Sequence, residues 1–275
     1  MNFFLKTIGL LTVLIISNGL FAQDFQGIAT YKSHRKVDLK MDDKNTNSEM
    51  QKQIQEQLKK QFQQEYTLEF NKNESIYKRV EKLDKPSIPN SSGITIKISQ
   101  SSDIMYKNIQ DHRYTNKTEI SGKIFLVKDS LKNKKWQLLN ETKYIGEYAC
   151  FKAVFEEEYT TKTITSDGKF EDVTKEKTTT VWYTPQIPVS HGPEDYFGLP
   201  GLILEVNDGE LTLICSKIVI NPKETFEIKE PEKGKEVSQK EFNDIQERKN
   251  KEMMEQFQSR RGSREGETFM IRVGS

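Results

Sequence analysis

The chain has 275 residues, and its 42 Lys and Arg nearly balance its 41 Asp and Glu. This balance excludes the basic excess that nucleic-acid binders carry. A chain of this length is ample for one large core or two small ones. Frequent Tyr (10) and Phe (15) favour β structure.

The first 22 residues have the pattern of an export signal. Lys6 and the free amine form a short positive start, an apolar run follows from about Ile8 to Ile16, and Ala22 offers a small residue before the cut. The apolar run is too short to span a bilayer, so a cleaved signal is favoured over a retained anchor. No later run is long enough for a membrane-spanning helix. We therefore expect an exported protein, periplasmic or secreted.

The first half of the mature chain predicts strands around one helix. Residues 27–40 alternate loosely and predict a first strand. Residues 48–64 predict an early helix, because apolar residues recur every four positions, at Met50, Ile54, Leu58 and Phe62. Residues 66–70 and 75–80 alternate with period two and predict a hairpin. Short strands are expected at 94–98, 104–108, 112–116, 123–128 and 136–139.

The second half predicts two hairpins and a late helix. Residues 148–160 predict a long strand, which returns to about residue 184 through an Asp-Gly turn near residue 167. Residues 199–206 and 210–220 flank a second turn and form the clearest hairpin. Ser238 and Glu241 have capping-box spacing and open a charged helix that reaches about residue 258. Residues 269–271 read as an edge strand.

These elements indicate an α+β fold. We expect a mostly antiparallel β meander that forms a curved sheet or open half-barrel, with the early helix at 48–64 and the charged helix at 238–258. The expected organisation is a signal peptide at 1–22, a single β-rich domain at 23–230 and a charged helical tail at 231–275.

A run of prolines and glycines between residues 185 and 201 is the most unusual segment. Proline fixes φ and glycine permits positive φ, so such a segment follows one specified, irregular path. We expect Pro200 and Gly201 to form the centre of a type II turn, with positive φ at Gly201. That turn would set the register of the strand that follows.

The chemistry that the sequence offers is sparse. His34, His112 and His191 do not cluster, and no metal-ligand, nucleophile-elbow, phosphate-loop or other cofactor motif occurs. His191, Glu194 and Asp195 lie close together in the proline-rich run. They could form a metal site or an acid–base pair, but a polar loop surface is the favoured reading.

Aromatic residues bracket the proline-rich run. Core packing is the default for them, and an aromatic-lined ligand mouth is the alternative. The residues expected at such a binding surface are Trp182, Tyr183, Pro188, His191, Gly192, Pro193, Tyr196, Phe197, Gly198, Pro200 and Gly201. Cys150 and Cys215 lie on expected strands, and they either form a disulfide or remain two buried thiols.

Phe197-Gly-Leu-Pro-Gly-Leu-Ile203 resembles the signature of the GLPGLI family of exported proteins, found mainly in Bacteroidetes. The block from Trp136 to Ala153, with its cysteine, and the Trp-to-Gly-Pro block from Trp182 to Pro193 are similar to further family blocks. The resemblance covers roughly residues 25 to 245. It implies export, and it supplies neither an activity nor a catalytic residue.

Two functions follow from these observations. The first is a non-catalytic envelope protein that binds an apolar ligand, a peptide or an outer-membrane partner near the Pro185–Pro200 loop. The second is a hydrolase or metal-dependent enzyme that uses His191 with Glu194 or Asp195. A deep apolar cavity would favour the first, and a cleft that joins His191 to the acids would favour the second.

Overall fold

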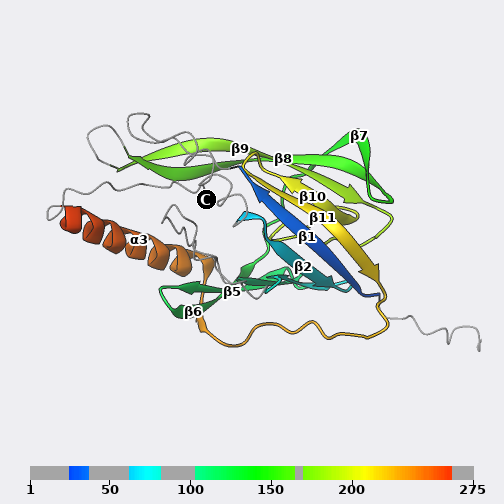
Figure 1. The fold of residues 1–275 in the computed structure, drawn as a ribbon, viewed down its shortest axis with the longest axis horizontal. Coiled ribbons are helices and arrows are strands. Elements are labelled where there is room, and N and C mark those ends of the chain that lie inside the picture. Colours follow the sequence, from blue (N-terminus) through cyan, green and yellow to red (C-terminus); the bar gives the residue numbers. More distant parts are fainter. Residues whose placement is uncertain (1–24, 37–61, 82–102, 165–169, 262–275) are drawn as a thin grey trace, which may run out of the picture.

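The structure is a computed structural model that describes residues 25–36, 62–81, 103–164 and 170–261. Its described part is one sheet of twelve strands with a helix near the C-terminus (Figure 1). The strand order is β12-β6-β5-β4-β3-β2-β1-β11-β10-β9-β8-β7, and the two edge strands do not pair with each other. All neighbours are antiparallel except β12 and β6, which are parallel.

The strands follow the sequence pattern closely. Their bounds are β1 Gly27–Arg35, β2 Glu65–Phe70, β3 Glu74–Arg79, β4 Ile104–Asn108, β5 Arg113–Ile120, β6 Lys123–Ser130, β7 Gln137–Ile145, β8 Tyr148–Ile164, β9 Phe170–Thr184, β10 Leu202–Asn207, β11 Leu211–Ile220 and β12 Lys235–Val237. The helix is α3, Gln239–Arg261. Short turns join most neighbouring strands, which is why local alternation predicted so many of them.

One face of the sheet carries the core, and we call it the inner face. Tyr31 on β1 pairs with Tyr66 on β2, Leu68 pairs with Tyr77 on β3, and Ser75 pairs with Lys107 on β4. Directly paired residues share a face, so this register brings alternate residues of each strand to the inner side. The main core cluster there contains Ala29, Tyr31, Leu68, Phe70, Tyr77, Cys150, Ile187, Val189, Leu202, Leu204 and Cys215.

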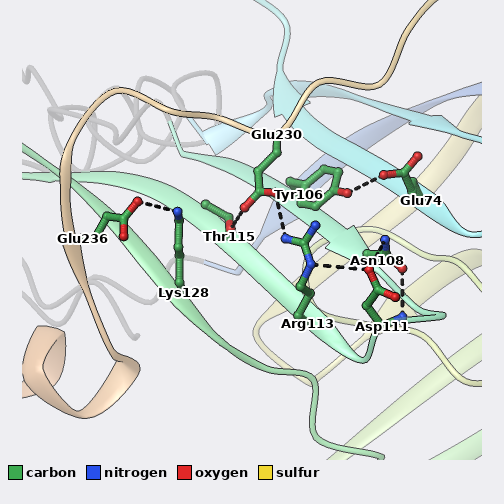
Figure 2. A network of polar contacts seen from close by, with 9 residues as sticks. All are labelled: Glu74, Tyr106, Asn108, Asp111, Arg113, Thr115, Lys128, Glu230 and Glu236. Carbon is green, nitrogen blue, oxygen red and sulfur yellow. Dashed lines mark hydrogen bonds and ion pairs between the residues drawn. The ribbon is translucent and has the colours of Figure 1, made fainter.

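The chain after β11 wraps around the sheet. Residues 221–234 form an extended strap that Glu230 fastens to the opposite face: Arg113 Nη1 donates to its carboxylate at 2.7 Å and Thr115 Oγ1 at 2.5 Å (Figure 2). The strap leads into β12, which covers the edge of β6. Helix α3 then turns back, and Phe242 packs against Phe125 on β6 with ring centroids 5.8 Å apart. Residues 235–237 therefore belong to the same sheet as residues 27–220.

Two elements extend past one end of the sheet, which we call the Arg35 end. Strands β1 and β3 finish there, at Arg35 and Arg79, and β2 and β4 begin there. Strands β8 and β9 pair only with each other beyond the Thr180–Asn207 pair, so their hairpin projects from this end. Figure 1 shows α3 extending towards the same side of the molecule. The inner face is thus flanked by two projections at the Arg35 end.

The expected β meander and late helix are confirmed, including the capping box, in which Ser238 N and Oγ donate to the Glu241 carboxylate. The early helix is not supported. Its residues 48–61 lie outside the described part; Phe62 is helical, whereas Gln63 and Gln64 are not, and β2 follows at once. The expected strands at 94–98 and 269–271 and the Asp-Gly turn near residue 167 also lie outside the described residues.

The expected geometry of the Gly-Leu-Pro-Gly turn is wrong in one respect. Positive φ occurs at Gly198, at +94°, and not at Gly201. Gly201 is required for a different reason: a Cβ placed on it would lie 2.2 Å from the backbone oxygen of Thr184. The end of β9 passes directly against this glycine, so close approach of two backbones, rather than a left-handed conformation, excludes a side chain.

Alanine substitutions should separate these two reasons. We expect Gly201→Ala to lower the free energy of unfolding by about 2–3 kcal/mol, because the backbone of β9 must move. Gly198→Ala should cost only about 1 kcal/mol, because its φ is unfavourable but its Cβ would meet only the Trp136 side chain, at an ordinary contact distance of 3.6 Å. Gly209→Ala, at φ +93° with nothing within 4 Å, is the matched control for Gly198. Urea unfolding measures all three, and a Gly201→Ala protein no weaker than the control would contradict the close-approach argument.

Candidate functional site: the signature loop on the inner face

Residues 185–201, here called the signature loop, connect β9 to β10 and lie against the inner face. Backbone bonds fold the loop onto the start of β10: Leu202 N donates to Ile187 O, and Ile203 N donates to His191 O, both at 3.0 Å. The Tyr31 hydroxyl donates to Ile203 O at 2.6 Å and ties this junction to β1. Ile187 and Val189 join the main core cluster. The loop is therefore part of the core and not a surface excursion.

A buried lysine on β4 holds the middle of the signature loop. Lys107 on β4 is fully buried, and its Nζ donates to the carbonyls of Gly192 at 2.8 Å, Glu194 at 2.6 Å and Tyr196 at 3.1 Å. Three acceptors match the three donors of an ammonium group, whereas a neutral amine has only two. Burial nevertheless lowers the pKa of Lys107 to about 7, although the nearby charge of Asp195 acts to raise it. This one side chain fixes the middle of the signature loop.

His191 is sealed in the interior. Its side chain is fully buried, its ring packs beside Phe70 with centroids 6.4 Å apart, and neither ring nitrogen has a hydrogen bond of ordinary geometry. Burial and, to a smaller extent, the charge of nearby Lys107 lower its pKa to about 3, although the backbone carbonyls of Asn71 and Lys72 act to raise it. A neutral imidazole with no solvent access is a core residue and does not serve as an acid–base catalyst in this arrangement.

The two acids that follow His191 point elsewhere. Asp195 is exposed and forms an ion pair with Lys134 at 2.7 Å. Lys134 also lies over the rings of Phe155 and Tyr196, at 4.9 and 5.0 Å. Among the described residues, no group of three His, Cys, Asp or Glu side chains could hold a metal ion. The geometry does not favour the enzyme reading that joins His191 to these acids.

Glu194 has a distinct environment. Its backbone is held in the left-handed region, at φ 48°, which is unfavourable for a non-glycine residue. Its carboxyl group is half-buried and forms no ion pair with a described residue. Burial raises its pKa to about 7, and the neighbouring Asp195 and Asp208 add to the effect, while Arg35 and Lys177 oppose it. The Lys107 contact to its carbonyl maintains this strained backbone and so aims the carboxyl.

Two stacked tyrosines lie on the inner face near Glu194. Tyr66 and Tyr77 are stacked, with centroids 5.1 Å apart and planes 8° apart. Tyr77 is only 5% exposed, yet its hydroxyl has no hydrogen-bond partner. Burial raises the pKa of both phenols, and Glu194 is the strongest charged contributor at each. The charge of Glu194 thus acts on both phenols, and we call Tyr66, Tyr77 and Glu194 the Tyr–Glu cluster.

Most residues expected at a binding surface are core residues. Tyr183, His191, Gly192, Pro193, Tyr196, Phe197 and Gly201 are buried, Trp182 is half-buried, and Pro188, Gly198 and Pro200 are exposed. Trp136 Nε1 donates to Phe197 O at 2.9 Å, which adds the upstream tryptophan block to the loop. The structure thus brings these residues together around the loop, and most of them pack in the core.

Cys150 and Cys215 are both free in the structure. They lie in the same core cluster, and burial raises their pKa to about 11 and about 12. Of the two alternatives that the sequence left open, the structure has the pair of buried apolar thiols.

A cavity lies on the opposite face, near the Arg35 end. It has a volume of about 470 Å³ and is lined by residues of β2 to β5 and their ends: Thr67, Glu69, Lys78, Arg79, Val80, Glu81, Asp103, Ile104 and Lys117. Lys78 and Glu69 on its wall already pair at 2.7 Å. It does not touch the signature loop.

Sequence reasoning missed Lys107 and the two tyrosines. Lys107 stands in the strand pattern Ile-Met-Tyr-Lys-Asn, where a charged residue ordinarily indicates a solvent-facing position. A signal existed for Tyr66 and Tyr77, because both alternate in phase with apolar residues of their strands. Nothing in the sequence linked them to a glutamate more than a hundred residues away.

Removing the buried ammonium should destabilise the fold. We expect Lys107→Met to lower the free energy of unfolding by about 2–4 kcal/mol, because three buried carbonyls lose their donor. Lys217→Met is the control, since Lys217 is exposed on β11 and its loss should change stability by no more than about 0.5 kcal/mol. Chemical denaturation compares the two, and equal midpoints would show that the loop does not depend on Lys107.

The raised pKa of Glu194 predicts a pH-dependent stability. Between its ordinary value of 4.5 and about 7, the folded chain binds a proton that the unfolded chain releases, so folding stability falls as pH rises through this window. Glu194→Gln removes this loss, and we expect it to gain about 1 kcal/mol over the wild type between pH 5 and pH 8. Thermal unfolding at both pH values checks this, with exposed Glu210→Gln as control. A difference between variant and wild type that does not change with pH would contradict it.

The fold and the loop define an open, almost entirely antiparallel sheet protein with an internal loop that is locked by a lysine. Residues 136–205 match the model of a family described as a protein of unknown function, Porph_ging. The matched span includes the tryptophan and cysteine blocks and the Gly-Leu-Pro-Gly-Leu-Ile signature, so this match is consistent with the resemblance to GLPGLI-type proteins. The description carries no activity.

No curated protein matches the chain. Among solved structures, the chain is similar to PNGF-II in space groups C2 and P21, at 14% identity and TM-scores of 0.45 and 0.46. The similarity covers 80% of this chain and 32% of PNGF-II, so the chain spans about a third of that protein's length. No described helix is long and apolar enough to cross a membrane.

Proposed function

We propose that the protein is an exported, non-catalytic binding protein of the envelope, whose ligand contacts the inner face of the sheet beside the signature loop. The observation that carries this proposal is the Tyr–Glu cluster. Buried polar groups are ordinarily satisfied, and both the unpartnered Tyr77 hydroxyl and the unpaired, half-buried Glu194 carboxyl are costly to the free protein. A ligand that completes these contacts would remove that cost.

The position of the cluster supports the same proposal. It lies towards the Arg35 end, where the β8–β9 hairpin and α3 project beyond the sheet on either side of the inner face. Proteins often place ligand sites at the open end of a curved sheet, where a rigid scaffold meets less constrained segments. The two stacked phenol rings supply a flat apolar surface, which suits part of an apolar ligand or a peptide side chain. The signature loop is the rigid segment that fixes the position of Glu194.

The test begins with protein purified from its native envelope. We expect native mass spectrometry to find an N-terminus at Gln23 and an additional bound mass in the wild type. Tyr66→Ala should lose that mass because it removes half of the stacked pair. Tyr144→Ala should retain it, since Tyr144 is 77% exposed on the edge strand β7, away from the cluster. A wild type without bound mass, or equal retention by both variants, would refute the proposal.

A further inference from the structure

The cavity on the opposite face has the size of a small-molecule site. Its volume is about 470 Å³, and sites for small ligands typically measure about 300–1,000 Å³. We propose that this cavity binds a small organic anion, with a carboxylate group at Lys117 and an apolar body over Ile104. The cavity and the Tyr–Glu cluster lie on different faces of the sheet, so this inference goes beyond the proposed function and does not depend on it.

One row of paired residues crosses the floor of the cavity. Thr67 on β2 pairs with Lys78 on β3, and Lys78 pairs with Ile104 on β4. Ile104 in turn pairs with Lys117 on β5. Directly paired residues share a face, and neighbouring strands lie about 4.8 Å apart. The Cα atoms of the two lysines are therefore about 10 Å apart, with Ile104 between them, and all four residues line the cavity.

Lys117 differs from its charged neighbours on this face because it lacks a counter-charge. Arg113, four residues earlier on β5, pairs with Glu230 at 2.7 Å, and Lys128 on β6 pairs with Glu236 (Figure 2). Lys117 is half-buried, yet its side chain forms no ion pair or hydrogen bond with a described residue. Its ammonium group has lost part of its hydration without gaining an acceptor. An anion from outside the chain would supply that acceptor.

The other charged residues of the lining are matched or in water. Lys78 and Glu69 pair with each other at 2.7 Å. Arg79 and Asp103 each have an interaction of their own. Glu81 is exposed, so water and salt screen its charge. The ammonium of β5 is therefore the half-buried charge in the lining that a ligand can neutralise.

The cavity also has an apolar part. Ile104 and Val80 are half-buried and line it, together with Thr67, whose side chain carries a methyl group. Covering these side chains removes apolar surface from water, which is favourable. A bare inorganic ion would leave this surface and most of the volume in water. The lining therefore suits an anion that carries an apolar body, and Ile104 lies directly beside the lysine that would hold the head group.

Three probes with the same six-carbon chain test the head group. Titration calorimetry on the chain from Gln23 compares hexanoate, hexanol and hexylamine near neutral pH and at low ionic strength. We expect hexanoate to bind at least about tenfold more tightly than the other two, which corresponds to about 1.4 kcal/mol. This preference should shrink at about 1 M salt, because salt screens the charge. Equal binding of hexanoate and hexanol, or tighter binding of hexylamine, would overturn the inference.

Lysine variants locate the head group. Lys117→Met removes an ammonium that has no partner among the described residues, so the protein should fold normally and bind hexanoate no more tightly than hexanol. Lys117→Arg keeps the charge and should keep the preference. Lys217→Met is the matched control, because Lys217 is exposed on β11 and its loss should leave the preference unchanged. A preference for hexanoate that persists in Lys117→Met would overturn the assignment of this residue.

A variant of the floor locates the apolar body. Ile104→Thr keeps a branched side chain on β4 and shortens it, so it should weaken hexanoate and hexanol alike, by about threefold. The preference for the anion should remain, since Lys117 is unchanged. Unaltered binding of both probes would contradict the placement of the body over Ile104. None of these outcomes bears on the proposed function, which is decided by the mass bound to the protein from the envelope.

Discussion

The structure depends on the three hydrogen bonds that Lys107 donates to the signature loop. An irregular loop carries carbonyl groups that no strand can satisfy, and in the core of a sheet they have no water. A single ammonium satisfies three of them at once and replaces the hydration that burial removes. Because the acceptors belong to Gly192, Glu194 and Tyr196, the path of the loop is specified over five consecutive residues.

These hydrogen bonds from Lys107 explain why the signature loop has a structural role. The loop fills the concavity of the inner face with Ile187, Val189 and Leu199, and its glycines allow close backbone approach at Gly201 and a left-handed turn at Gly198. Function, where the structure suggests it, lies at the margin of the loop. Glu194 is the residue at which the loop leaves the core, and its position follows directly from the contact that Lys107 makes to its carbonyl.

The two edges of the sheet are protected against further strand pairing in different ways. The chain covers the β6 edge with its own β12 and reinforces it with α3 and the Glu230 contacts. Edge β7 has no such cover among the described residues, but it contains an irregularity between Leu138 and Thr142. Its Glu141 pairs with Lys152 on β8, and its Lys143 pairs with Glu205 on β10. Irregular, charged edges discourage sheet extension, so both edges are protected by different means.

The sequence by itself determined most of the local elements and the family resemblance. Period-two alternation predicted the β2–β3 hairpin, looser alternation predicted β1, and turn residues predicted the β10–β11 hairpin, because each strand carries its own pattern of buried and exposed faces and short turns join neighbours. The capping box at Ser238 predicted the start of α3 for the same reason, since all its contacts lie within one turn. The Gly-Leu-Pro-Gly-Leu-Ile stretch gave the resemblance to GLPGLI proteins, and the family model matches the segment that contains it.

Only the tertiary structure decided which residues meet. Lys107 and Glu194 are 87 positions apart, and no local rule predicts that a lysine will be buried by carbonyls from a distant loop. His191 illustrates the same point: its neighbours in sequence suggested an active site, whereas packing placed it in the core and turned both acids away. Burial sets the free energy of a charge and long-range packing sets burial, so the roles of these residues were fixed by the fold and not by their spacing along the chain.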